Sequence, residues 1–408
     1  MTSDQRVVVI GGGLAGLRLA ARLTGAAAVT VLGEEPHVPY NRVLLAEVLA
    51  GRYAPEVTAL PTPGPALRRG VRAVRIDRAD RTVRCDDGTV AEYDTLVLAT
   101  GSNAVLPPLR ALFEPEGRDL PDGVHAFRTM DDCLALSAAV RPGARAVVIG
   151  GGLLGVSAAR ALAARGAVVV LAQQGERLME RHLDTEASAL LAAHLTGLGV
   201  EIHTECRVRG LITSAAPRGH REVTGVELAD GYRLDADLVV LACGVRPRVG
   251  LARAAGLDVR TGVVVDDHLR TSDPRIHAIG DCAEHAGQVY GLAGAALEQA
   301  DALAAVLTGT PARYTGTRAL TRLTLGGTEN GSLDLAAFGE TTPRPGDDVV
   351  RLADATRRTY RKVVLRDDRL VGGVLLGELS TVGALARTWE GDESPHDLFH
   401  LLTDDGGH

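Results

Sequence analysis

Residues 7–16 of the chain read Val7-Val8-Val9-Ile10-Gly11-Gly12-Gly13-Leu14-Ala15-Gly16, and this stretch decides the fold. A short apolar run of strand type meets a glycine-rich turn, and leucines and alanines at helical spacing follow it. Glycines in this G-x-G-x-x-G pattern make the turn tight, let the backbone approach a pyrophosphate and let the helix pack closely on the strand. The pyrophosphate charge then lies at the positive helix N-terminus. The pattern predicts a dinucleotide-binding β–α–β unit.

The same pattern returns at residues 146–155, which read Ala146-Val147-Val148-Ile149-Gly150-Gly151-Gly152-Leu153-Leu154-Gly155. A helix is expected over residues 153–165 and a second strand over residues 168–171. One such match is weak evidence, because glycine clusters also arise by chance in a glycine-rich chain. Two matches, each in a β–α–β context, predict two dinucleotide sites.

An acidic residue after the second strand of such a unit accepts hydrogen bonds from the ribose hydroxyls of adenosine. In the first unit Glu34 or Glu35 fits this position, although a solvated pair of loop residues is the alternative. Counting from the first glycine of each motif, Gln173 takes the place of Glu34. An amide does not distinguish NAD from NADP. Arg177 and Arg181 nearby leave NADP open, because arginine attracts a 2′-phosphate.

Further buried strands close each half. Residues 95–101 and 237–244 are apolar runs that end in small residues, as expected where the chain returns over a bound dinucleotide. A third run, residues 276–279, ends in Gly280 and Asp281, so the second half is predicted to be inserted into the first. Asp281 can bind polyol hydroxyls; an N-cap of the following segment is the alternative.

The remaining segments complete an α/β fold with two nested Rossmann-like, three-layer dinucleotide-binding domains and a C-terminal α+β domain. The domains expected are residues 1–115 with 244–313, residues 116–243, and residues 314–408 as an interface or dimerisation domain. Residues 102–143 are expected to be a connection. One helix is expected to end at Leu49, a second to cover residues 178–198 and a third to cover residues 382–389. A further short segment is expected at residues 398–402. Other strands are expected at residues 71–76, 82–85, 89–93, 200–203, 223–228, 319–325, 333–338, 360–365 and 370–376.

Composition excludes several classes of protein. A net charge of −7 and 3% aromatic residues argue against a nucleic-acid partner. Lys362 is the sole lysine, which excludes a phosphate-loop NTPase. Apolar runs fall short of the ~18 residues of a membrane span, and no signal peptide precedes the first strand, so we expect a cytoplasmic protein without a membrane partner. The five cysteines are scattered, and no metal site is predicted.

Further signatures show a family resemblance. They are Glu34-Glu35-Pro36-His37, Tyr40-Asn41-Arg42, Ala99-Thr100-Gly101-Ser102, Arg128-Thr129-Met130-Asp131-Asp132, Cys243-Gly244-Val245-Arg246-Pro247, Thr271-Ser272-Asp273-Pro274 and Gly280-Asp281-Cys282-Ala283. With the two glycine motifs, they resemble the FAD-dependent pyridine nucleotide-disulfide oxidoreductase superfamily. The likeness extends to class I reductases, above all the N-terminal flavin module of NADH-dependent nitrite reductase large subunits, and to rubredoxin and ferredoxin reductases. It implies a glutathione reductase-like fold.

The resemblance also implies the site residues. The first glycine turn and the acid after it would hold the ADP half of FAD, Val74 would line the adenine and Asp281 would bind the ribityl chain. The residues implied for FAD are Gly11, Gly13, Leu14, Ala15, Gly16, Glu34, Glu35, Arg42, Val74, Ala99, Thr100, Gly101, Arg128, Gly280, Asp281 and Ala293. Those implied for NAD(P) are Gly150, Gly152, Leu153, Leu154, Gly155, Gln173, Arg177 and Gly244.

Three departures from the family pattern bear on function. Residues 40–50 lack the cysteines that disulfide reductases carry there, so electrons would leave the flavin directly for an external acceptor. Glu47 stands where some relatives have a lysine near the flavin, and Ser157 where many have a glutamate next to the nicotinamide.

The sequence therefore predicts an FAD-dependent NAD(P)H oxidoreductase in which the flavin carries out the hydride transfer, and no catalytic residue of the protein is predicted. Its acceptor would be an electron-transfer protein such as a ferredoxin, a rubredoxin or a reductase subunit, or else a small molecule, in a pathway such as nitrite or nitrate assimilation. A homodimer is expected. Two alternatives remain: a flavoenzyme that acts on a small organic substrate with weakened nicotinamide use, and a flavin-binding protein that is not an enzyme.

Overall fold

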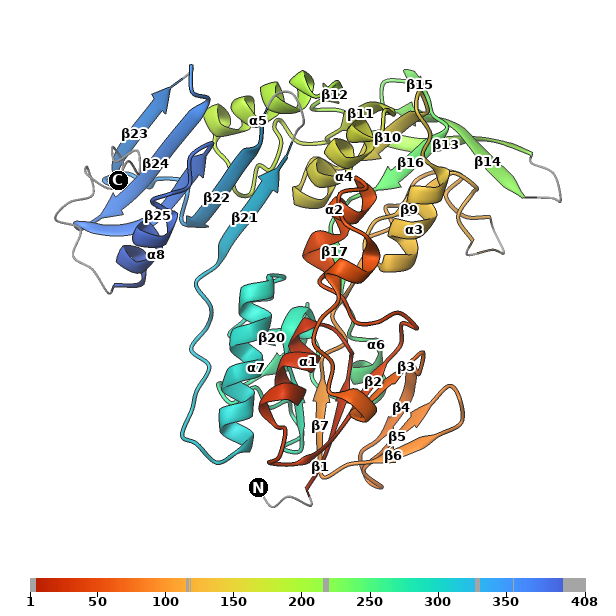
Figure 1. Cartoon of the computed structure of the whole chain (residues 1–408), viewed down its shortest axis with the longest axis vertical. Helices are drawn as coiled ribbons and strands as arrows, with labels where there is room; N and C mark the ends of the chain where they lie inside the picture. Colours follow the sequence, from red (N-terminus) through yellow and green to blue (C-terminus); the bar gives the residue numbers. More distant parts are fainter. Residues whose placement is uncertain are drawn as a thin grey trace. The chain divides into compact units, whose positions relative to one another are not determined.

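A computed structural model describes residues 5–114, 117, 119–215, 220–326, 331–354 and 356–391 (Figure 1). The chain forms two compact units, each assembled from segments that are distant in the sequence. Unit 1 comprises Met1–Leu45, Tyr53–Asn103 and Val245–Ala319, and unit 2 comprises Ala46–Arg52, Ala104–Gly244 and Leu320–His408. Within the described ranges, none of the helices combines the length and the apolar character that a membrane span requires.

Unit 1 is built on a parallel sheet with the strand order β19-β7-β1-β2-β3. Strand β7 is buried along its whole length, as is typical of a parallel sheet with both faces covered. Strand β19 follows the second glycine motif in the chain, yet Ile276 pairs with Leu96 of β7, which confirms the predicted insertion. The strands are β1 Arg6–Ile10, β2 Ala28–Gly33, β3 Leu67–Arg69, β7 Thr95–Leu98 and β19 Ile276–Ala278.

Helices and a small antiparallel sheet, β4-β5-β6, complete unit 1. Helix α1, Leu14–Arg22, packs against α7, Ala293–Leu307, and Asp301 of α7 accepts hydrogen bonds from Arg18 and Arg22 at 2.8 Å each. The other elements are η1 Arg42–Leu44, η2 Pro55–Thr58, η3 Gly64–Ala66, β4 Ala73–Asp77, β5 Thr82–Cys85, β6 Val90–Glu92, β17 Val245–Pro247, α6 Gly250–Ala254, β18 Val263–Val265, η5 Gly280–Cys282 and β20 Ala283–His285. Helix α2, Leu45–Leu49, and strand β8, Ser102–Ala104, lie where the chain passes from unit 1 to unit 2.

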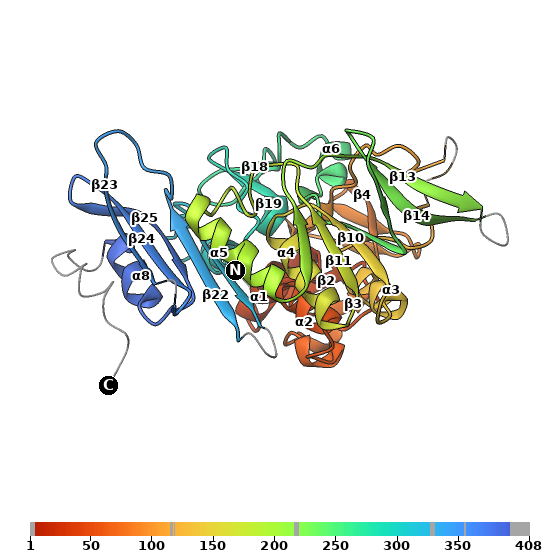
Figure 2. The same ribbon diagram turned by 90° about the horizontal axis from the view of Figure 1, so that it is seen from above.

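Unit 2 repeats this plan with the parallel order β12-β11-β10-β16-β9 and an antiparallel sheet, β13-β14-β15. Helices α4 and α5 pack on β11 and β12 (Figure 2). The elements are β9 Val124–Ala126, α3 Met130–Ala139, β10 Arg145–Ile149, α4 Leu153–Ala164, β11 Val168–Ala172, α5 Thr185–Gly197, β12 Val200–His203, β13 Val208–Ala215, β14 Arg221–Leu228, β15 Arg233–Asp235 and β16 Leu238–Leu241.

Unit 2 also contains the C-terminal antiparallel sheet, in the order β21-β22-β25-β24-β23, and the helix α8, which packs on β25. Phe338, Val363, Leu375 and Leu385 are among the residues of its apolar core. The elements are β21 Leu320–Leu325, β22 Leu333–Gly339, β23 Asp348–Asp354, β24 Thr359–Arg366, β25 Arg369–Leu376 and α8 Val382–Glu390. The predicted fold class is confirmed, and the three domain boundaries stay a prediction.

Some sequence-based expectations about single elements were wrong. The expected connection over residues 102–143 contains α3, whose start has a capping box in which Thr129 and Asp132 bond each other's backbone N–H. The helix expected from Leu178 begins instead at the N-cap Asp184, because Met179 has a φ of +48°. Strands β13 and β23 were not predicted. The segment expected at residues 398–402 lies outside the described residues.

Candidate functional site

The first glycine turn joins β1 to α1 in unit 1. Gly11 has a φ of +126°, and a Cβ on it would lie 2.0 Å from the carbonyl oxygen of Ala99. A Cβ on Gly16 would lie 2.1 Å from the carbonyl oxygen of Gly11. These two glycines are required by the protein itself.

Gly13 is different, because neither its backbone conformation nor the atoms around it require a glycine. Its φ of −86° is one that any residue adopts, and no atom of the described residues lies within 4 Å of the position of a Cβ. Gly13 is also the N-cap of α1, and no side chain that the structure describes caps that end of the helix. The open space therefore faces backbone N–H groups and the positive end of a helix, which is where the pyrophosphate of a dinucleotide fits.

The two candidate ribose acids of unit 1 have different partners. Glu34 forms an ion pair with Arg248 at 2.5 Å. Glu35 accepts a hydrogen bond from the Tyr40 hydroxyl at 2.6 Å and pairs with Arg42. Both side chains are partly exposed after the end of β2, so both stay candidates for the ribose hydroxyls.

Asp281 is held beside the first glycine turn. A Cβ on Gly280 would lie 3.2 Å from Cβ of Ala15 in α1, and Gly280 N–H donates to Oε1 of the buried Gln299 at 2.7 Å. The Ser102 hydroxyl donates to Oδ2 of Asp281 at 2.8 Å. A carboxylate in this position suits a polyol chain that continues from the pyrophosphate.

The other residues implied for FAD are distributed over both units. The Thr100 hydroxyl, next to Ala99 and Gly101, donates to the carbonyl oxygen of Arg248 at 2.9 Å in unit 1. Val74 is 44% exposed in β4, and Ala293 is the first residue of α7. Arg128 belongs to unit 2, where its N–H donates to Oδ2 of Asp132 at 3.0 Å.

The second glycine turn, between β10 and α4 in unit 2, repeats the first. Cβ atoms on Gly150 and Gly155 would lie 2.5 Å from the oxygen of Ala242 and 1.7 Å from the oxygen of Gly150. Gly152 has a φ of −79°, and within the described part of the chain no atom lies within 4 Å of a Cβ on it and no side chain caps α4. Leu153 and Leu154 form the first turn of this helix. The second turn therefore has the same open helix start as the first. Gly244, with a φ of +95°, follows the closing strand β16.

Strand register corrects the position expected for Gln173. Ile10 pairs with Leu32 in unit 1, and Ile149 pairs with Ala172 in unit 2. Gln174 is therefore equivalent to Glu34. The count from the first glycine was wrong by one, because the segment between Gly155 and β11 is one residue longer than its counterpart in unit 1.

Gln173 takes the place of Gly33, and its Oε1 accepts a hydrogen bond from Gly151 N–H at 2.8 Å. Arg177 Nε donates to the carbonyl oxygen of Leu183 at 3.3 Å, and Arg181 is exposed. The amide of Gln173 thus contacts the backbone of the glycine turn, and Gln174, at the position of Glu34, is exposed.

Ser157 and Glu47 have structural partners in unit 2. The Ser157 hydroxyl donates to the carbonyl oxygen of Leu153, one turn back in α4, at 2.8 Å. Glu47 Oε1 lies 2.5 Å from Nη2 of Arg160, a side chain that is 1% exposed. Burial lowers the pKa of Arg160, while Glu47 raises it. Arg160 was not predicted from the sequence, where its place in an alanine-rich helix gave no signal.

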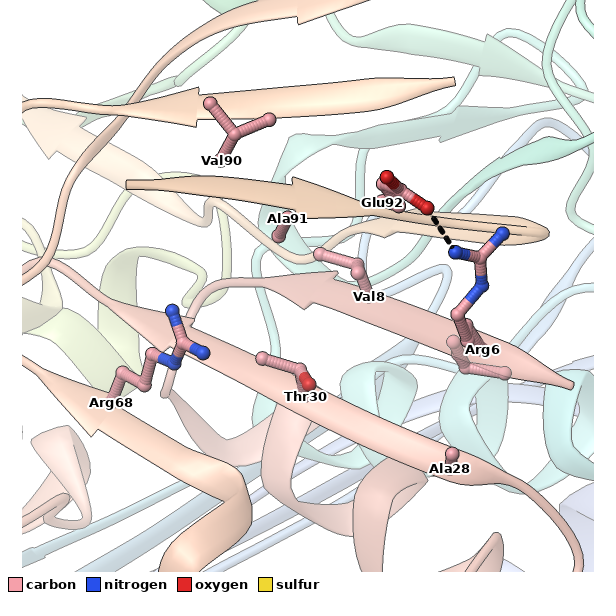
Figure 3. A pocket seen from close by; sticks show the side chains of 9 residues that line it. Arg6, Val8, Ala28, Thr30, Arg68, Val90, Ala91 and Glu92 are labelled. Carbon is pink, nitrogen blue, oxygen red and sulfur yellow. Dashed lines mark hydrogen bonds and ion pairs between the residues drawn. The ribbon is translucent and has the colours of Figure 1, made fainter. Parts of the chain in front are cut away.

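A cavity of about 360 Å³ in unit 1 lies on the face of the parallel sheet that the small sheet covers (Figure 3). Val8 and Thr30 of β1 and β2 face β6 across it, and Arg6 forms an ion pair with Glu92. Arg6 and Ala28 lie at the N-terminal ends of their strands, whereas Gly11 follows the C-terminal end. This cavity is therefore separate from the glycine turn.

The described part of the chain contains neither a disulfide nor a cluster of metal-binding side chains. The five cysteines are free, and burial raises the pKa of Cys133 and of Cys243 to about 11. Among the described residues, no three His, Cys, Asp or Glu side chains cluster closely enough to bind a metal ion.

Residues 5–300 match the pyridine nucleotide-disulphide oxidoreductase family, and residues 331–390 match the rubredoxin NAD⁺ reductase C-terminal domain. A nitrite reductase (NAD(P)H) of Bacillus subtilis (strain 168) is 34% identical over 387 residues, which cover 92% of this chain and 46% of that protein. Rhodocoxin reductase of Rhodococcus erythropolis is 35% identical over 326 residues, which cover 76% of this chain and 73% of that protein. The chain thus spans about half the length of the nitrite reductase that it matches.

Solved structures give the same likeness. Putidaredoxin reductase in its covalent complex with putidaredoxin matches with a TM-score of 0.83 and 27% identity, over 100% of both chains. A ferredoxin reductase from Rhodopseudomonas palustris matches with a TM-score of 0.78 and 30% identity, over 92% of this chain and 91% of that one.

Proposed function

Because the chain belongs to the pyridine nucleotide-disulphide oxidoreductase family, we propose that it passes electrons from NAD(P)H through FAD to an electron-transfer protein. The family match confirms the resemblance predicted from the sequence. FAD and NAD(P)H are the cofactors of this family, and two dinucleotides need two pyrophosphate cradles. The observation that carries the proposal is the pair of open spaces at Gly13 and Gly152, each at the uncapped start of a helix.

In this function, each candidate site residue of unit 1 binds one part of FAD or orients a residue that does. The N–H groups at the start of α1 receive the pyrophosphate, Glu34 or Glu35 accepts hydrogen bonds from the ribose hydroxyls, and Asp281 accepts one from the ribityl chain. Ser102 orients Asp281 through its hydroxyl. When bound, FAD supplies the chemistry, since it accepts a hydride and releases electrons. The protein supplies position and electrostatics.

The acceptor is proposed from the relatives. The match to the rubredoxin NAD⁺ reductase C-terminal domain and the likeness to rhodocoxin and putidaredoxin reductases support an iron–sulfur electron-transfer protein. The nitrite reductase relatives support a role in nitrite or nitrate assimilation. A cytoplasmic location, a homodimer formed through residues 314–408 and the three domain boundaries belong to the same proposal.

Flavin binding and reduction test the proposal. The purified protein is expected to be yellow, and anaerobic stopped-flow mixing with NADH or NADPH is expected to bleach the flavin absorbance. Asp281→Ala is expected to yield colourless protein, and Ser102→Ala to retain flavin with weaker affinity, because it removes only the hydrogen bond that orients Asp281. Retention of stoichiometric flavin by Asp281→Ala contradicts the FAD site. Failure of both nucleotides to bleach the flavin contradicts the reductase function.

A further inference from the structure

The two halves of the chain share one backbone frame at the adenosine end of each nucleotide site. In unit 1, Val71 N–H donates to the oxygen of Gly33 at 2.9 Å, and in unit 2, Cys206 N–H donates to the oxygen of Gln173 at 2.8 Å. A neighbouring bond repeats too, from Gly70 to Glu35 in unit 1 and from Glu205 to Gly175 in unit 2. Residues of the two halves can therefore be paired position by position.

The carboxylates of the first site are missing from the second. In this frame Gln174 is equivalent to Glu34, and Gly175 is equivalent to Glu35. A carboxylate at the ribose favours the free 2′-hydroxyl of NAD and repels a 2′-phosphate. Neither equivalent position of the second site therefore carries a carboxylate of its own, although Oε2 of Glu180 lies 2.1 Å from the position of a Cβ on Gly175.

A third carboxylate is also absent. In unit 1, Asp86 N–H donates to the oxygen of Arg72 at 2.9 Å, and the Asp86 carboxylate accepts from Arg72 N–H at 2.9 Å and lies 3.8 Å from its guanidinium. In unit 2, Ala229 N–H donates to the oxygen of Arg207 at 2.8 Å, so Ala229 stands where Asp86 stands. Arg207 thus keeps the position of Arg72 without its acidic partner.

A positive charge is added next to Arg207. Strand β4 has a β-bulge at Val74, and strand β13 has the equivalent bulge at Arg209. An apolar side chain of the first site is therefore an arginine in the second. Between the two halves, the three acids Glu34, Glu35 and Asp86 become neutral and Val74 becomes Arg209, while the neutral Gly70 becomes Glu205.

Arg207 and Arg209 line a cavity of about 340 Å³ together with Arg110, whose N–H donates to the oxygen of Arg209 at 3.1 Å. All three side chains are exposed. Across the part of the chain that the structure describes, none of their guanidinium groups has a hydrogen-bond or ion-pair partner. Unpaired arginines around one cavity suit an anion with several oxygen acceptors, such as a phosphate monoester.

We propose that Arg207 and Arg209, supported by Arg110, bind the 2′-phosphate of NADPH, so that the second site prefers NADP(H) to NAD(H). This inference rests on the proposed function, which assigns the nicotinamide dinucleotide to unit 2. The phosphate is recognised by Arg209, which the first half lacks, and by Arg207, whose counterpart Arg72 is paired with Asp86. The amides at Gln173 and Gln174 tolerate it.

Isothermal titration of the flavin-loaded protein with 2′,5′-ADP and with 5′-AMP isolates this contact, because the two probes differ only in the 2′-phosphate. We expect 2′,5′-ADP to bind at least about tenfold more tightly than 5′-AMP, since hydrogen bonds to charged groups are the strong ones. Arg207→Gln and Arg209→Gln are each expected to weaken 2′,5′-ADP about tenfold and 5′-AMP less than about twofold.

Two further variants sharpen the test. Ala229→Asp restores the carboxylate of the first half next to Arg207 and is expected to weaken 2′,5′-ADP while it leaves 5′-AMP unchanged. Arg72→Gln, the equivalent substitution in unit 1, is the matched control and is expected to leave both affinities unchanged. A far-UV circular dichroism spectrum and thermal midpoint equal to those of the parent show that each variant folds.

Equal affinity for the two probes overturns the inference, as does a loss in Arg207→Gln and Arg209→Gln that affects both probes alike. Variants that alter only the rate with an electron-acceptor protein would assign the arginines to that partner and overturn it too. The proposed function fails separately, when neither NADH nor NADPH bleaches the flavin although 2′,5′-ADP still binds.

Discussion

His277 makes stability depend on pH at the scale of a single residue. It lies in β19, is 4% exposed, and its Nδ1 has no hydrogen-bond partner among the described residues. The pKa of His277 is lowered to about 4, mainly by burial and to a smaller extent by Arg270, against backbone hydrogen bonds and the charge of Asp266, which raise it. In the unfolded chain its pKa is about 6.5.

The sign follows from which state binds the proton. Below pH ~6.5 the unfolded chain protonates this histidine while the folded protein does not, so stability falls with falling pH. The contribution of His277 to the free energy of unfolding is fully present above pH ~6.5 and is lost progressively toward pH ~4. At pH ~5 the loss is about 2 kcal/mol. We expect His277→Gln to show a smaller loss in thermal midpoint between pH ~7 and pH ~5 than the parent protein. His268→Gln, on a neighbouring turn, is the control, and an unchanged pH dependence in His277→Gln contradicts the assignment.

A local pattern is enough to single out some residues as candidates for the two sites, and these assignments stay predictions. The spacing of the glycines singled out Gly13 and Gly152, and the end of a strand singled out Asp281. Gln174 and Arg209 could not be found in this way. One inserted residue shifts the count to Gln174, and the equivalence of Arg209 with Val74 depends on a β-bulge and on pairing between strands distant in sequence.

Asp184 couples two elements of unit 2, helix α5 and strand β24. Its Oδ1 accepts from Ala187 N–H at 3.0 Å as the N-cap of α5. Its Oδ2 accepts from Lys362 Nζ at 2.8 Å and from the Tyr360 hydroxyl at 2.7 Å. The Lys362 side chain, from the sole lysine of the chain, is 4% exposed. The role of Lys362 is therefore structural: its ion pair with Asp184 joins the helix to the strand.

Removing one partner of this ion pair is expected to cost more than removing both charges. Lys362→Met leaves Asp184 charged and poorly solvated, which typically destabilises a protein by about 3 kcal/mol or more. Lys362→Met combined with Asp184→Asn is expected to recover part of that loss, because asparagine still caps the helix. Urea unfolding followed by circular dichroism measures both variants. A double variant no more stable than Lys362→Met shows that the charge of Asp184 is not the cause.

Elements were predicted where hydrophobic periodicity and the turn chemistry agree. Both β–α–β units meet this condition, so β1, α1, β10 and α4 were expected to within two residues. Strand β23 was missed because its exposed and partly buried positions alternate around charged residues, which gives it no apolar run. Helix α3 was missed although its capping box is legible, because proline and glycine dominate the surrounding segment.

At the scale of the whole molecule, the chain uses one plan twice with different charges. Arg6 N–H donates to Asp94 Oδ2 at 2.9 Å where the first parallel sheet begins, and Arg145 N–H donates to Asp237 Oδ2 at 2.9 Å where the second begins. The frame is thus repeated down to single hydrogen bonds. The halves therefore differ in their side chains rather than in their fold.

Two cradles of the same kind should be separable by one substitution in each. Alanine fits at Gly13 and Gly152, since both have an ordinary φ and no atom within 4 Å of a Cβ, so each variant is expected to fold. A ligand at about 100 times its Kd stabilises the folded state by about 2.7 kcal/mol, which raises the thermal midpoint by a few degrees. We expect Gly13→Ala apoprotein to lose the shift caused by FAD and to keep the shift caused by NADP⁺, and Gly152→Ala to show the reverse. Differential scanning calorimetry of the two variants measures both shifts. The loss of both shifts in either variant contradicts two separate sites, whereas Gly16→Ala, whose Cβ would lie 2.1 Å from the oxygen of Gly11, is expected to destabilise the protein without any ligand.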